Sequence, residues 1–469
     1  MADSLAAARH VHLVGIGGSG MATLGHLLLQ MGKSVSGSDL ADSTAAERLR
    51  RAGATVYLGH AAGHVAGADY VVRSSAVPAA TNPEVVEAER LGLPSVKHAE
   101  ALGELTRGRP TAAVAGTHGK TTTTALIAWL LERGGQDPMA LAGGDALNFT
   151  SGALLGDGPV VVEADEYDRR FLHLWPDVAV VTSIEADHLD YFADLDEIVA
   201  AFQKLVQRLP ASGRLVVCLD DARAAALRTL AQRDSYGFAA DAAWRATDYE
   251  PVRGGGSRFR LHVAGRSWPV ESSLLGAHNV ANSLAALAVA DYFGVGLATA
   301  VSQLATFKGT RRRFETKGRP GDVWLVDDYA HHPTAVAAVL GAAREHVGPP
   351  GAVWAVFQPH SAHRTAALLG EFAGAFEAAD HVLVLPIYHP SGREREKDSA
   401  DAAATTSELV ARLAASGHPD TRAVPTFADA EATLLGRVRA GDVVLTMGAG
   451  DVTLLADRLL ASLGGSGSP

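Results

Sequence analysis

The sequence predicts an α/β protein of three domains, each with a mostly parallel sheet between layers of helices. Three observations support this prediction. The chain has 469 residues, more than a single hydrophobic core usually serves. Short apolar runs alternate with helical patterns along most of its length, and two glycine-rich turns each connect such a run to a helix. We place the boundaries near residues 108 and 313, so the predicted domains span 1–108, 109–313 and 314–469.

Composition narrows the class of protein. Hydrophobic residues make up 47% of the chain and charged residues 20%, as in ordinary globular proteins, and no run of about eighteen apolar residues occurs. The formal net charge of −11 disfavours a nucleic-acid-binding surface, and the single cysteine, Cys218, excludes an internal disulfide. The N-terminus lacks the pattern of a secretion signal. We therefore expect a cytoplasmic monomer or homodimer with no nucleic-acid or membrane partner.

The first glycine-rich turn predicts a Rossmann-like, nucleotide-binding domain. Val11 to Val14 form an apolar run, and the glycines after it fit the G-x-G-x-x-G pattern: Gly15, Gly17 and Gly20. A helical pattern follows, and Asp39 ends the next strand-like run. Glycines at a helix N-terminus let the backbone approach a pyrophosphate, and a carboxylate at Asp39 can accept ribose hydroxyls. NAD and UDP fit this pattern equally well, because each offers both groups.

The second turn, VAGTHGKTTTT, predicts a phosphate-binding loop in a P-loop ATPase-like domain. Thr111 to Ala115 form the strand before it, and a helical pattern runs from Thr121 to Arg133. Lys120 supplies an ammonium group for terminal phosphates and Thr121 a hydroxyl for a metal ion, so ATP with Mg²⁺ is the expected ligand. In a standard loop of this kind, however, a glycine stands where this chain has Val114.

Acidic residues follow two later strand patterns of the same domain. The first group is Glu163, Asp165, Glu166 and Asp168, and the second is Glu185, Asp187, His188 and Asp190. Both groups fall at the carboxyl ends of strands, where ligands sit in parallel sheets. Because Mg²⁺ prefers oxygen ligands, Glu163 is the best candidate for the metal site. His188 is a less usual second ligand, and a purely structural histidine is the alternative interpretation.

Polar clusters in the rest of the chain extend this prediction. A helical pattern opens with His278, Asn279 and Asn282, and three arginines, Arg311 to Arg313, stand at the second predicted boundary. Strand ends carry Asp327, Asp328, His331 and His332 in one place and His360, His363 and Arg364 in another. Solvated surface charge is the alternative for each cluster, but Arg364 is a natural partner for a substrate carboxylate. No cysteine–histidine or G-x-S-x-G pattern indicates a covalent nucleophile, so activation of a carboxylate by ATP is favoured.

The order of these motifs resembles that of the Mur ligase family across nearly the whole chain. The matching stretches are GIGGSGM, GSD, GTHGKTTTT, EADEYD, IEADHLD, HNVANSLAA, RRFE, DDYAHHPT, FQPH and MGAGD. In that family the ATP loop is the shorter G-T-x-G-K-T, so Gly116 is in register and Val114 is no defect. The resemblance implies a UDP-binding Rossmann-like domain, a central P-loop ATPase-like domain and a C-terminal Rossmann-like domain.

The resemblance also implies a reaction. The lactyl carboxylate of UDP-N-acetylmuramate attacks the γ-phosphate of ATP, and the amine of a small amino acid, expected to be L-alanine, displaces phosphate from the resulting acyl phosphate. Residues implied at the ATP and its Mg²⁺ ions are Gly116, Thr117, His118, Gly119, Lys120, Thr121, Thr122, Glu163, His188, His278, Asn279, Asn282, Arg312, Arg313 and Asp327. Those implied at the other substrates or the chemistry are Gly15, Gly17, Gly18, Gly20, Asp39, Ser74, Ser75, His331, His360 and Arg364.

The choice of acceptor is the most open part of this prediction. Ser361 and Ala362 stand where the family pattern leads us to expect basic and aromatic residues, so a recycling ligase that attaches an intact tripeptide is an alternative. A dehydrogenase would explain the first glycine turn with NAD but leaves the Lys120 loop without a role, and a non-catalytic nucleotide-binding protein is a further alternative. Lys204 could correspond to a lysine that is carbamylated in several relatives, although a surface lysine is the favoured interpretation.

Overall fold

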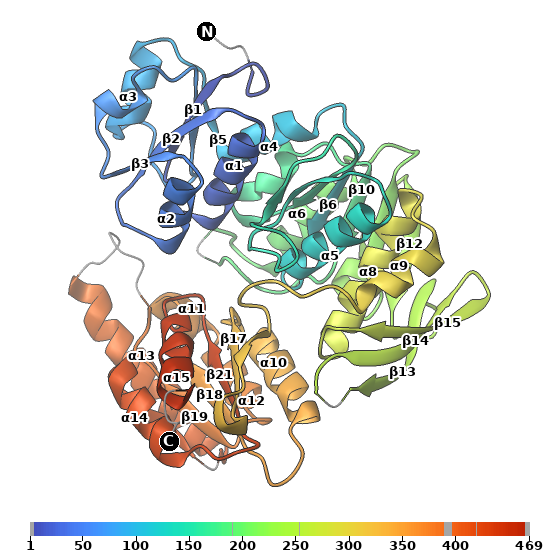
Figure 1. Cartoon of the computed structure of the whole chain (residues 1–469), viewed down its shortest axis with the longest axis vertical. Helices are drawn as coiled ribbons and strands as arrows, with labels where there is room; N and C mark the ends of the chain where they lie inside the picture. The colour runs from blue at the N-terminus through green and yellow to red at the C-terminus, as the bar shows by residue number, and fades with distance from the viewer. Residues whose placement is uncertain (1–3, 190, 253, 389–395, 419, 465–469) are drawn as a thin grey trace. The chain divides into compact units, whose positions relative to one another are not determined.

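The computed structural model describes residues 4–189, 191–252, 254–388, 396–418 and 420–464. Its contacts group into two compact units. The N-terminal unit contains Met1–Tyr249, Phe259–Ser272 and Asn279–Lys308, and the C-terminal unit contains Glu250–Arg258, Ser273–His278 and Gly309–Pro469. Each unit is described by itself (Figure 1).

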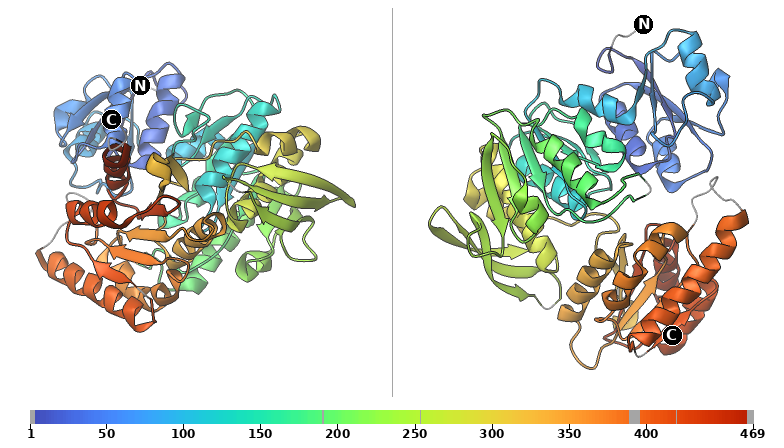
Figure 2. Two further views of the ribbon diagram at one scale, coloured as in Figure 1. Left: turned by 60° about the horizontal axis from the view of Figure 1, so that its bottom comes forward. Right: turned by 180° about the vertical axis from the view of Figure 1, so that it is seen from behind.

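The N-terminal unit begins with a five-stranded parallel sheet in the order β3-β2-β1-β4-β5. Its strands are β1 (His10–Val14), β2 (Ser34–Asp39), β3 (Thr55–Leu58), β4 (Tyr70–Arg73) and β5 (Ser95–Lys97). The surrounding helices are α1 (Ser19–Gln30), α2 (Thr44–Arg51), the 3-10 helix η1 (Ala62–Val65), α3 (Pro83–Arg90) and α4 (His98–Thr106). One face is covered by apolar residues of α1, α2 and α4 and the other by α3 and η1, so helices lie on both faces of the blue sheet in Figure 2.

The same unit continues with a ten-stranded sheet in the order β15-β14-β13-β12-β11-β10-β6-β9-β7-β8. The strands are β6 (Thr111–Ala115), β7 (Met139–Leu141), β8 (Ala153–Leu154), β9 (Val160–Glu163), β10 (Val178–Val181), β11 (Arg214–Cys218), β12 (Gln232–Gly237), β13 (Trp244–Pro251), β14 (Ser257–Val263) and β15 (Arg266–Ser272). The helices are α5 (Lys120–Arg133), η2 (Tyr167–His173), α6 (Leu195–Val206), α7 (Ala222–Ala226), α8 (Ala277–Tyr292) and α9 (Leu297–Leu304). Strands β9, β6 and β10 are parallel neighbours, so the loops after them meet at one edge.

The C-terminal unit is built on a six-stranded sheet in the order β16-β17-β21-β18-β19-β20, parallel except for β16. Its strands are β16 (Glu315–Gly318), β17 (Trp324–Asp328), β18 (Val353–Phe357), β19 (His381–Val384), β20 (Thr421–Ala423) and β21 (Val443–Met447). Its helices are η3 (Pro320–Asp322), α10 (Pro333–His346), α11 (Ala362–Ala367), α12 (Leu369–Ala375), α13 (Glu396–Ala415), α14 (Phe427–Arg437) and α15 (Thr453–Gly464). Apolar residues of α10, α12 and α13 cover one face, and those of α14 and α15 cover the other.

None of the described helices combines the length and the apolar character needed to cross a membrane. The strands and helices expected around both glycine-rich turns are present, and α5 begins one residue earlier than expected, at Lys120. The residue boundaries proposed between the three domains stay predictions.

Candidate active site

The loop between β6 and α5 adopts a conformation that requires glycine at two positions. Gly116 has a φ of +136° and Gly119 a φ of +80°, both in the region that residues with a side chain rarely adopt. A Cβ at Gly119 would lie 2.5 Å from Oδ1 of Asn282, and one at Gly116 would overlap the hydroxyl of Thr182. The glycines therefore let the loop lie against two polar side chains, and they leave the first N–H groups of α5 directed into the loop.

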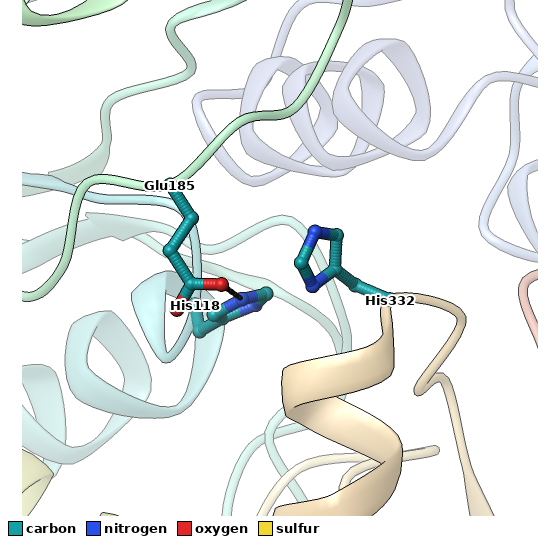
Figure 3. Close-up of side chains that lie close together, drawn as sticks. All are labelled: His118, Glu185 and His332. Atoms are coloured by element: carbon teal, nitrogen blue, oxygen red, sulfur yellow. Dashed lines mark ion pairs between the residues drawn. The ribbon is translucent and has the colours of Figure 1, made fainter. Parts of the chain in front are cut away.

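The loop after β10 holds this turn in place. The N–H of Thr117 donates to the Ser183 carbonyl at 2.8 Å, and the N–H of His118 donates to the Ser183 hydroxyl at 3.2 Å. In return, the N–H of Glu185 donates to Oγ1 of Thr117 at 2.8 Å. Figure 3 shows the ring of His118 turned toward the Glu185 carboxylate, with Nε2 3.4 Å from the nearer oxygen.

Lys120, the lysine expected to contact phosphates, is paired with Glu166. Its Nζ donates to the two carboxylate oxygens of Glu166 at 2.9 and 3.0 Å and to the Gly116 carbonyl at 2.5 Å. Burial alone would lower the pKa of Lys120, but the carboxylates of Glu166, Asp165 and Glu163 outweigh it and raise the pKa. Lys120 is therefore a charged ammonium group with 15% of its side chain exposed.

Glu163 and Thr121 form the metal candidate that the sequence predicts. The Thr121 hydroxyl donates to Oε1 of Glu163 at 3.1 Å, and the N–H of Gly143 fixes Oε2 at 2.6 Å. A Cβ at Gly143 would lie 2.8 Å from a Glu163 oxygen, so a side chain there would displace the carboxylate from this position. A hydroxyl and a carboxylate beside a phosphate-binding helix terminus are oxygen donors of the kind that Mg²⁺ binds, so these residues fit the ion.

His188 lies in a second group of possible ligands. One ligand atom each from His188, Asp165 and Glu166 lie within 4.8 Å of one another. His188 has a φ of +56°, an uncommon conformation for a residue with a side chain, and its ring lies 4.9 Å from that of Tyr167. Of the predicted metal set, Thr121 and Glu163 are thus in direct contact, whereas His188 is next to two other acids. Asp190, another acid of the predicted groups, lies outside the described residues.

The first glycine turn is held from the adjacent strands. Oδ2 of Asp39 accepts the N–H of Gly17 at 2.9 Å, so this carboxylate fixes the turn. Gly15 has a φ of +85°, and a Cβ there would lie 2.9 Å from the side chain of Ser74. Gly18 donates to the Gly15 carbonyl at 3.3 Å. The buried hydroxyl of Ser75 has no hydrogen-bond partner among the residues that the structure describes.

Helix α8 places two of the predicted amides at the ATP loop. Asn279 and Asn282 are buried, and Nδ2 of Asn282 donates to Oδ1 of Asn279 at 2.9 Å. Asn282 is also the residue that Gly119 approaches. His278 precedes them in α8 but belongs to the C-terminal unit, where its ring lies close to Gly276.

In the C-terminal unit, Asp327 is fully buried and organises Arg312. Its two oxygens accept from the hydroxyls of Thr446 and Thr453, both at 2.7 Å, and Arg312 Nε lies 3.4 Å from Oδ2. Arg312 and Arg313 both lie over the ring of Tyr329. Asp327 is thus an ion-pair partner of Arg312, with none of its side chain exposed.

Asp328 is the neighbouring buried carboxylate. It accepts the N–H groups of Phe314 and Ala330 at 2.6 and 2.7 Å. Burial raises the pKa of Asp328 to about 6, although the Arg313 guanidinium and these N–H groups oppose the rise. The carboxylate therefore titrates just below neutral pH.

His331 and His360 lie together at the carboxyl ends of β17 and β18. Their ring centroids are 6.0 Å apart, and His360 is also 6.0 Å from Tyr388. His331 Nδ1 lies 2.9 Å from the Tyr329 carbonyl, which fixes the ring. Arg364 lies in the first turn of α11, where its N–H donates to the capping Ser361 hydroxyl at 3.4 Å.

Sequence reasoning missed several residues of these sites. Glu166 was recognised only as one of several acids, and Thr182, Ser183 and Tyr388 were not singled out at all. Position along a strand end does not tell which acid turns toward Lys120, because Asp168 and Arg169 in the same segment adopt positive φ values that no periodic pattern predicts. The segment GTHGKT offered one signal for Ser183. The backbone N–H groups of this segment need hydrogen-bond acceptors, and Ser183 supplies two of them.

Comparisons with known proteins identify the family of this chain. Three family descriptions match the chain: Mur ligase family, catalytic domain, over residues 10–110; Mur ligase middle domain, over 114–290; and Mur ligase, glutamate ligase domain, over 312–450. A UDP-N-acetylmuramate–L-alanine ligase of Salinibacter ruber is 43% identical over 465 residues, covering 98% of this chain and 96% of that protein.

Two solved structures are similar over the same extent. A UDP-N-acetylmuramate–alanine ligase from Thermotoga maritima matches with a TM-score of 0.83 at 26% identity, and a murein peptide ligase from Psychrobacter arcticus with a TM-score of 0.72 at 28% identity. Each match covers 97% of this chain and 99% of the other. The predicted three-domain α/β fold is confirmed by these matches. Both the family descriptions and the close relative extend along nearly the whole sequence, and the chain belongs to the Mur ligase family.

Proposed function

We propose that this protein is an ATP-dependent ligase that joins L-alanine to the lactyl carboxylate of UDP-N-acetylmuramate, in the synthesis of peptidoglycan precursors. The observation that carries the proposal is the pairing of Lys120 and Thr121 with Glu166 and Glu163 at the start of α5, in a chain 43% identical to a ligase of that name. The reaction would take place in the cytoplasm, where ATP and nucleotide sugars are available.

The proposed chemistry has two steps. An oxygen of the lactyl carboxylate attacks the γ-phosphorus of ATP, and the bond between the γ-phosphorus and the β-phosphate oxygen breaks. The products of this step are ADP and an acyl phosphate. The amine of L-alanine then attacks the acyl carbon, loses a proton and displaces inorganic phosphate. The product of this step is an amide. In both steps the protein mainly positions the reactants and neutralises charge.

Residues of the N-terminal unit are proposed to bind the two phosphate-containing substrates. Lys120 contacts the β- and γ-phosphates, with loop N–H groups from Gly116 to Thr122 around them. Asn279 and Asn282 support that loop from α8. The turn at Gly15, Gly17, Gly18 and Gly20, with Asp39, Ser74 and Ser75, holds the UDP part.

Metal ions would act in the same place. Thr121 and Glu163 would hold one Mg²⁺, and His188, beside Asp165 and Glu166, would contribute to a second. Bound Mg²⁺ supplies charge neutralisation on the phosphate oxygens. The protein holds the metal-binding oxygens in place before the ion binds, as the N–H of Gly143 does for the Glu163 carboxylate.

Residues of the C-terminal unit are proposed to serve the amino acid and the nucleotide. Arg364 pairs with the carboxylate of the acceptor, while His360 and His331 lie beside its amine and assist proton transfer. Arg312 and Arg313 act on phosphate charge, and Asp327 orients Arg312. The role of His278 at the nucleotide stays a prediction.

A second candidate is a ligase that attaches an intact peptide to the same nucleotide sugar. The specific observation in its favour is the similarity to a murein peptide ligase, with a TM-score of 0.72. The absence of basic or aromatic residues at Ser361 and Ala362 removes one expected barrier to a larger acceptor.

One experiment decides between the candidates. Purified protein is incubated with ATP, Mg²⁺ and UDP-N-acetylmuramate, and with L-alanine, glycine, L-serine or the tripeptide in turn. Phosphate release is followed and the products are identified by mass. We expect a nucleotide sugar heavier by one alanine residue, with weaker turnover of glycine and L-serine, because a single methyl group allows about 1–3 kcal/mol of discrimination.

The other outcomes are equally clear. Product from the tripeptide alone would transfer the protein to the second candidate. Absence of product with every acceptor, in a preparation that binds ATP, would contradict the proposed function.

A further inference from the structure

Helix α4 contacts both substrate loops of the N-terminal unit. It begins at His98, directly after β5, and its apolar residues belong to the core that also contains α1 and η2. None of its residues belongs to the sets proposed for substrate binding or chemistry. The start of α4 is nevertheless the place where the first glycine turn and the acidic loop after β9 meet neighbouring side chains, His98 and Lys97.

On one side, His98 contacts the glycine turn. Its Nε2 lies 3.1 Å from the carbonyl oxygen of Gly20, in the first turn of α1. A Cβ at Gly20 would lie 3.1 Å from the imidazole ring, so the absence of a side chain at this glycine lets the ring approach. Because a carbonyl only accepts, Nε2 must carry the proton in this contact.

On the other side, His98 lies in the field of the acidic loop. Burial and, less strongly, the Arg170 guanidinium lower the pKa of His98 to about 4, although the bond to Gly20 and the Asp165 carboxylate oppose the shift. Arg170 and Asp165 are themselves joined at 2.8 Å. The ring is thus neutral at physiological pH, with its proton on Nε2 and its other nitrogen an acceptor.

Two further contacts fix α4 against this loop. Lys97, just before His98, forms an ion pair with Asp168 at 3.1 Å. Gly103, five residues further along α4, allows the backbone of η2 to approach: a Cβ there would lie 2.6 Å from the His173 carbonyl oxygen. Asp168 has a φ of +54°, so the segment that α4 holds is also conformationally restrained.

The acidic loop leads directly to the ATP loop. Asp165 belongs to the group of possible metal ligands with Glu166 and His188, and Glu166 holds Lys120. A set of contacts therefore runs from the Gly20 carbonyl to His98, from the adjacent Lys97 to Asp168, and along the acidic loop to Glu166 and Lys120. Packed contacts of this kind couple two sites only if ligands at both sites shift the position of one shared element. Helix α4 contacts both loops and can be that element.

We propose that His98 is a positioning residue that couples occupancy of the nucleotide-sugar turn to the geometry of the ATP loop. It acts through its bond to the Gly20 carbonyl and through the adjacent Lys97–Asp168 ion pair, which ties the same turn of α4 to the acidic loop. This inference rests on the proposed function, because it takes the two loops to bind UDP-N-acetylmuramate and ATP. It assigns the first turn of α4 a role in making the two substrates bind together.

The test measures binding of each substrate with and without the other. Calorimetry gives the dissociation constant of UDP-N-acetylmuramate for the full chain, alone and with Mg²⁺ and a non-hydrolysable ATP analogue. The ratio of the two constants is the coupling factor, which must be the same in the reverse titration. In wild-type protein we expect the analogue to tighten nucleotide-sugar binding by roughly fivefold or more.

Variants of His98 separate coupling from folding. His98→Leu removes the N–H donor, and we expect its coupling factor to fall to about one while each substrate alone binds within about threefold of wild type. His98→Gln places an amide N–H near the Gly20 carbonyl and is expected to restore most of the coupling. His418→Leu is the matched control, since His418 bonds the Ala379 carbonyl at 2.9 Å in the C-terminal unit.

The outcomes distinguish this inference from the proposed function. An unchanged coupling factor in His98→Leu, equal values for the Leu and Gln variants, or wild-type protein that binds both substrates without coupling would overturn the inference and leave the function standing. Loss of nucleotide-sugar binding in His98→Leu without the analogue would also overturn it, by placing His98 in the binding site itself. Wild-type protein that does not bind the nucleotide sugar would contradict the proposed function instead.

Discussion

At the scale of single residues, the ATP loop depends on a buried ammonium group. Lys120 keeps its charge because three carboxylates surround it, and its Nζ is bonded to Glu166 and to the Gly116 carbonyl. A charge held in this way can turn to developing negative charge on phosphate without reorganising solvent.

We predict that Lys120→Ala lowers turnover by roughly 10³-fold or more, since the ammonium group stabilises charge in the transition state. Phosphate release and product mass measure the effect. Lys204→Ala is the control: Lys204 is exposed on α6, and we expect turnover within about twofold of wild type. A large loss in Lys204→Ala would instead support a modified lysine at that position.

We also predict that Gly119→Ala damages the loop more than the helix it caps. The added methyl group would clash with the Asn282 amide, and alanine would be strained at the φ of +80° that residue 119 adopts. We therefore expect ATP binding to weaken at least tenfold. Gly135→Ala, at the other end of α5, has a similar φ of +76° but open space around it. That variant should lose about 1 kcal/mol of stability and keep its ATP affinity, as measured by denaturation and by calorimetry.

At the scale of elements, helix α3 carries a buried carboxylate that supports the first glycine turn. Glu84 accepts from the Ser38 hydroxyl at 2.5 Å and from His64 Nδ1 at 2.7 Å, and His12 Nε2 lies 3.6 Å away. The Ser38 carbonyl in turn accepts the N–H groups of Gly15 and Ile16. The turn is therefore tied through β2 to a helix on the far side of its own sheet.

This arrangement predicts a specific pH dependence of stability. Burial raises the pKa of Glu84, but His12, Ser38 and His64 outweigh it and lower the pKa to about 2. A depressed folded-state pKa adds stability above the unfolded value, about 4.5, and loses it as the pH falls toward 2. We expect Glu84→Gln to be about 3 kcal/mol less stable than wild type at pH 7, with the difference shrinking between pH 4.5 and 2.

Urea denaturation across this pH range measures the difference. Glu89→Gln is the control, because Glu89 is exposed on the same helix and should change stability by less than about 0.5 kcal/mol. A Glu84→Gln difference that is constant from pH 7 to pH 2 would show that volume and packing, not the charge, carry the effect.

Most elements could be predicted from the sequence, while the site could be predicted only in part. The runs Val11–Val14 and Thr111–Ala115 are apolar enough to identify β1 and β6, and glycines mark the helices after them. Strands β16 and β20 were not expected, since ETKG and TRA are short and polar and pair only because the sheet offers an edge. The sequence placed acids at strand ends, but tertiary packing decides which one meets Lys120.

At the scale of the whole molecule, the proposed work is divided between the two units. The nucleotide loops belong to the N-terminal unit, and His331, His360 and Arg364 belong to the C-terminal unit. A defect in the C-terminal histidines should therefore affect the second chemical step more than the first.

We predict that His360→Ala slows amide formation by roughly 10²-fold or more, because a proton-transfer group is lost, and leaves formation of the acyl phosphate intact. Borohydride trapping of the acyl phosphate, compared with amide yield, separates the two steps. His363→Ala is the matched control, because His363 is exposed on α11, and it should behave like wild type. Equal loss of both steps in His360→Ala would contradict this division of labour.

The bond between Lys120 and Glu166 has a consequence for how nucleotide affinity should be understood. Glu166 contacts the Lys120 ammonium group much as phosphate oxygens would, so a nucleotide that binds Lys120 exchanges one anionic partner for another. Its dissociation constant therefore reports the difference between two ion pairs and not the strength of either. The Glu166 carboxylate thus competes with the nucleotide for Lys120. A nucleotide gains affinity from Lys120 only to the extent that its phosphates bind the ammonium group more strongly than Glu166 does.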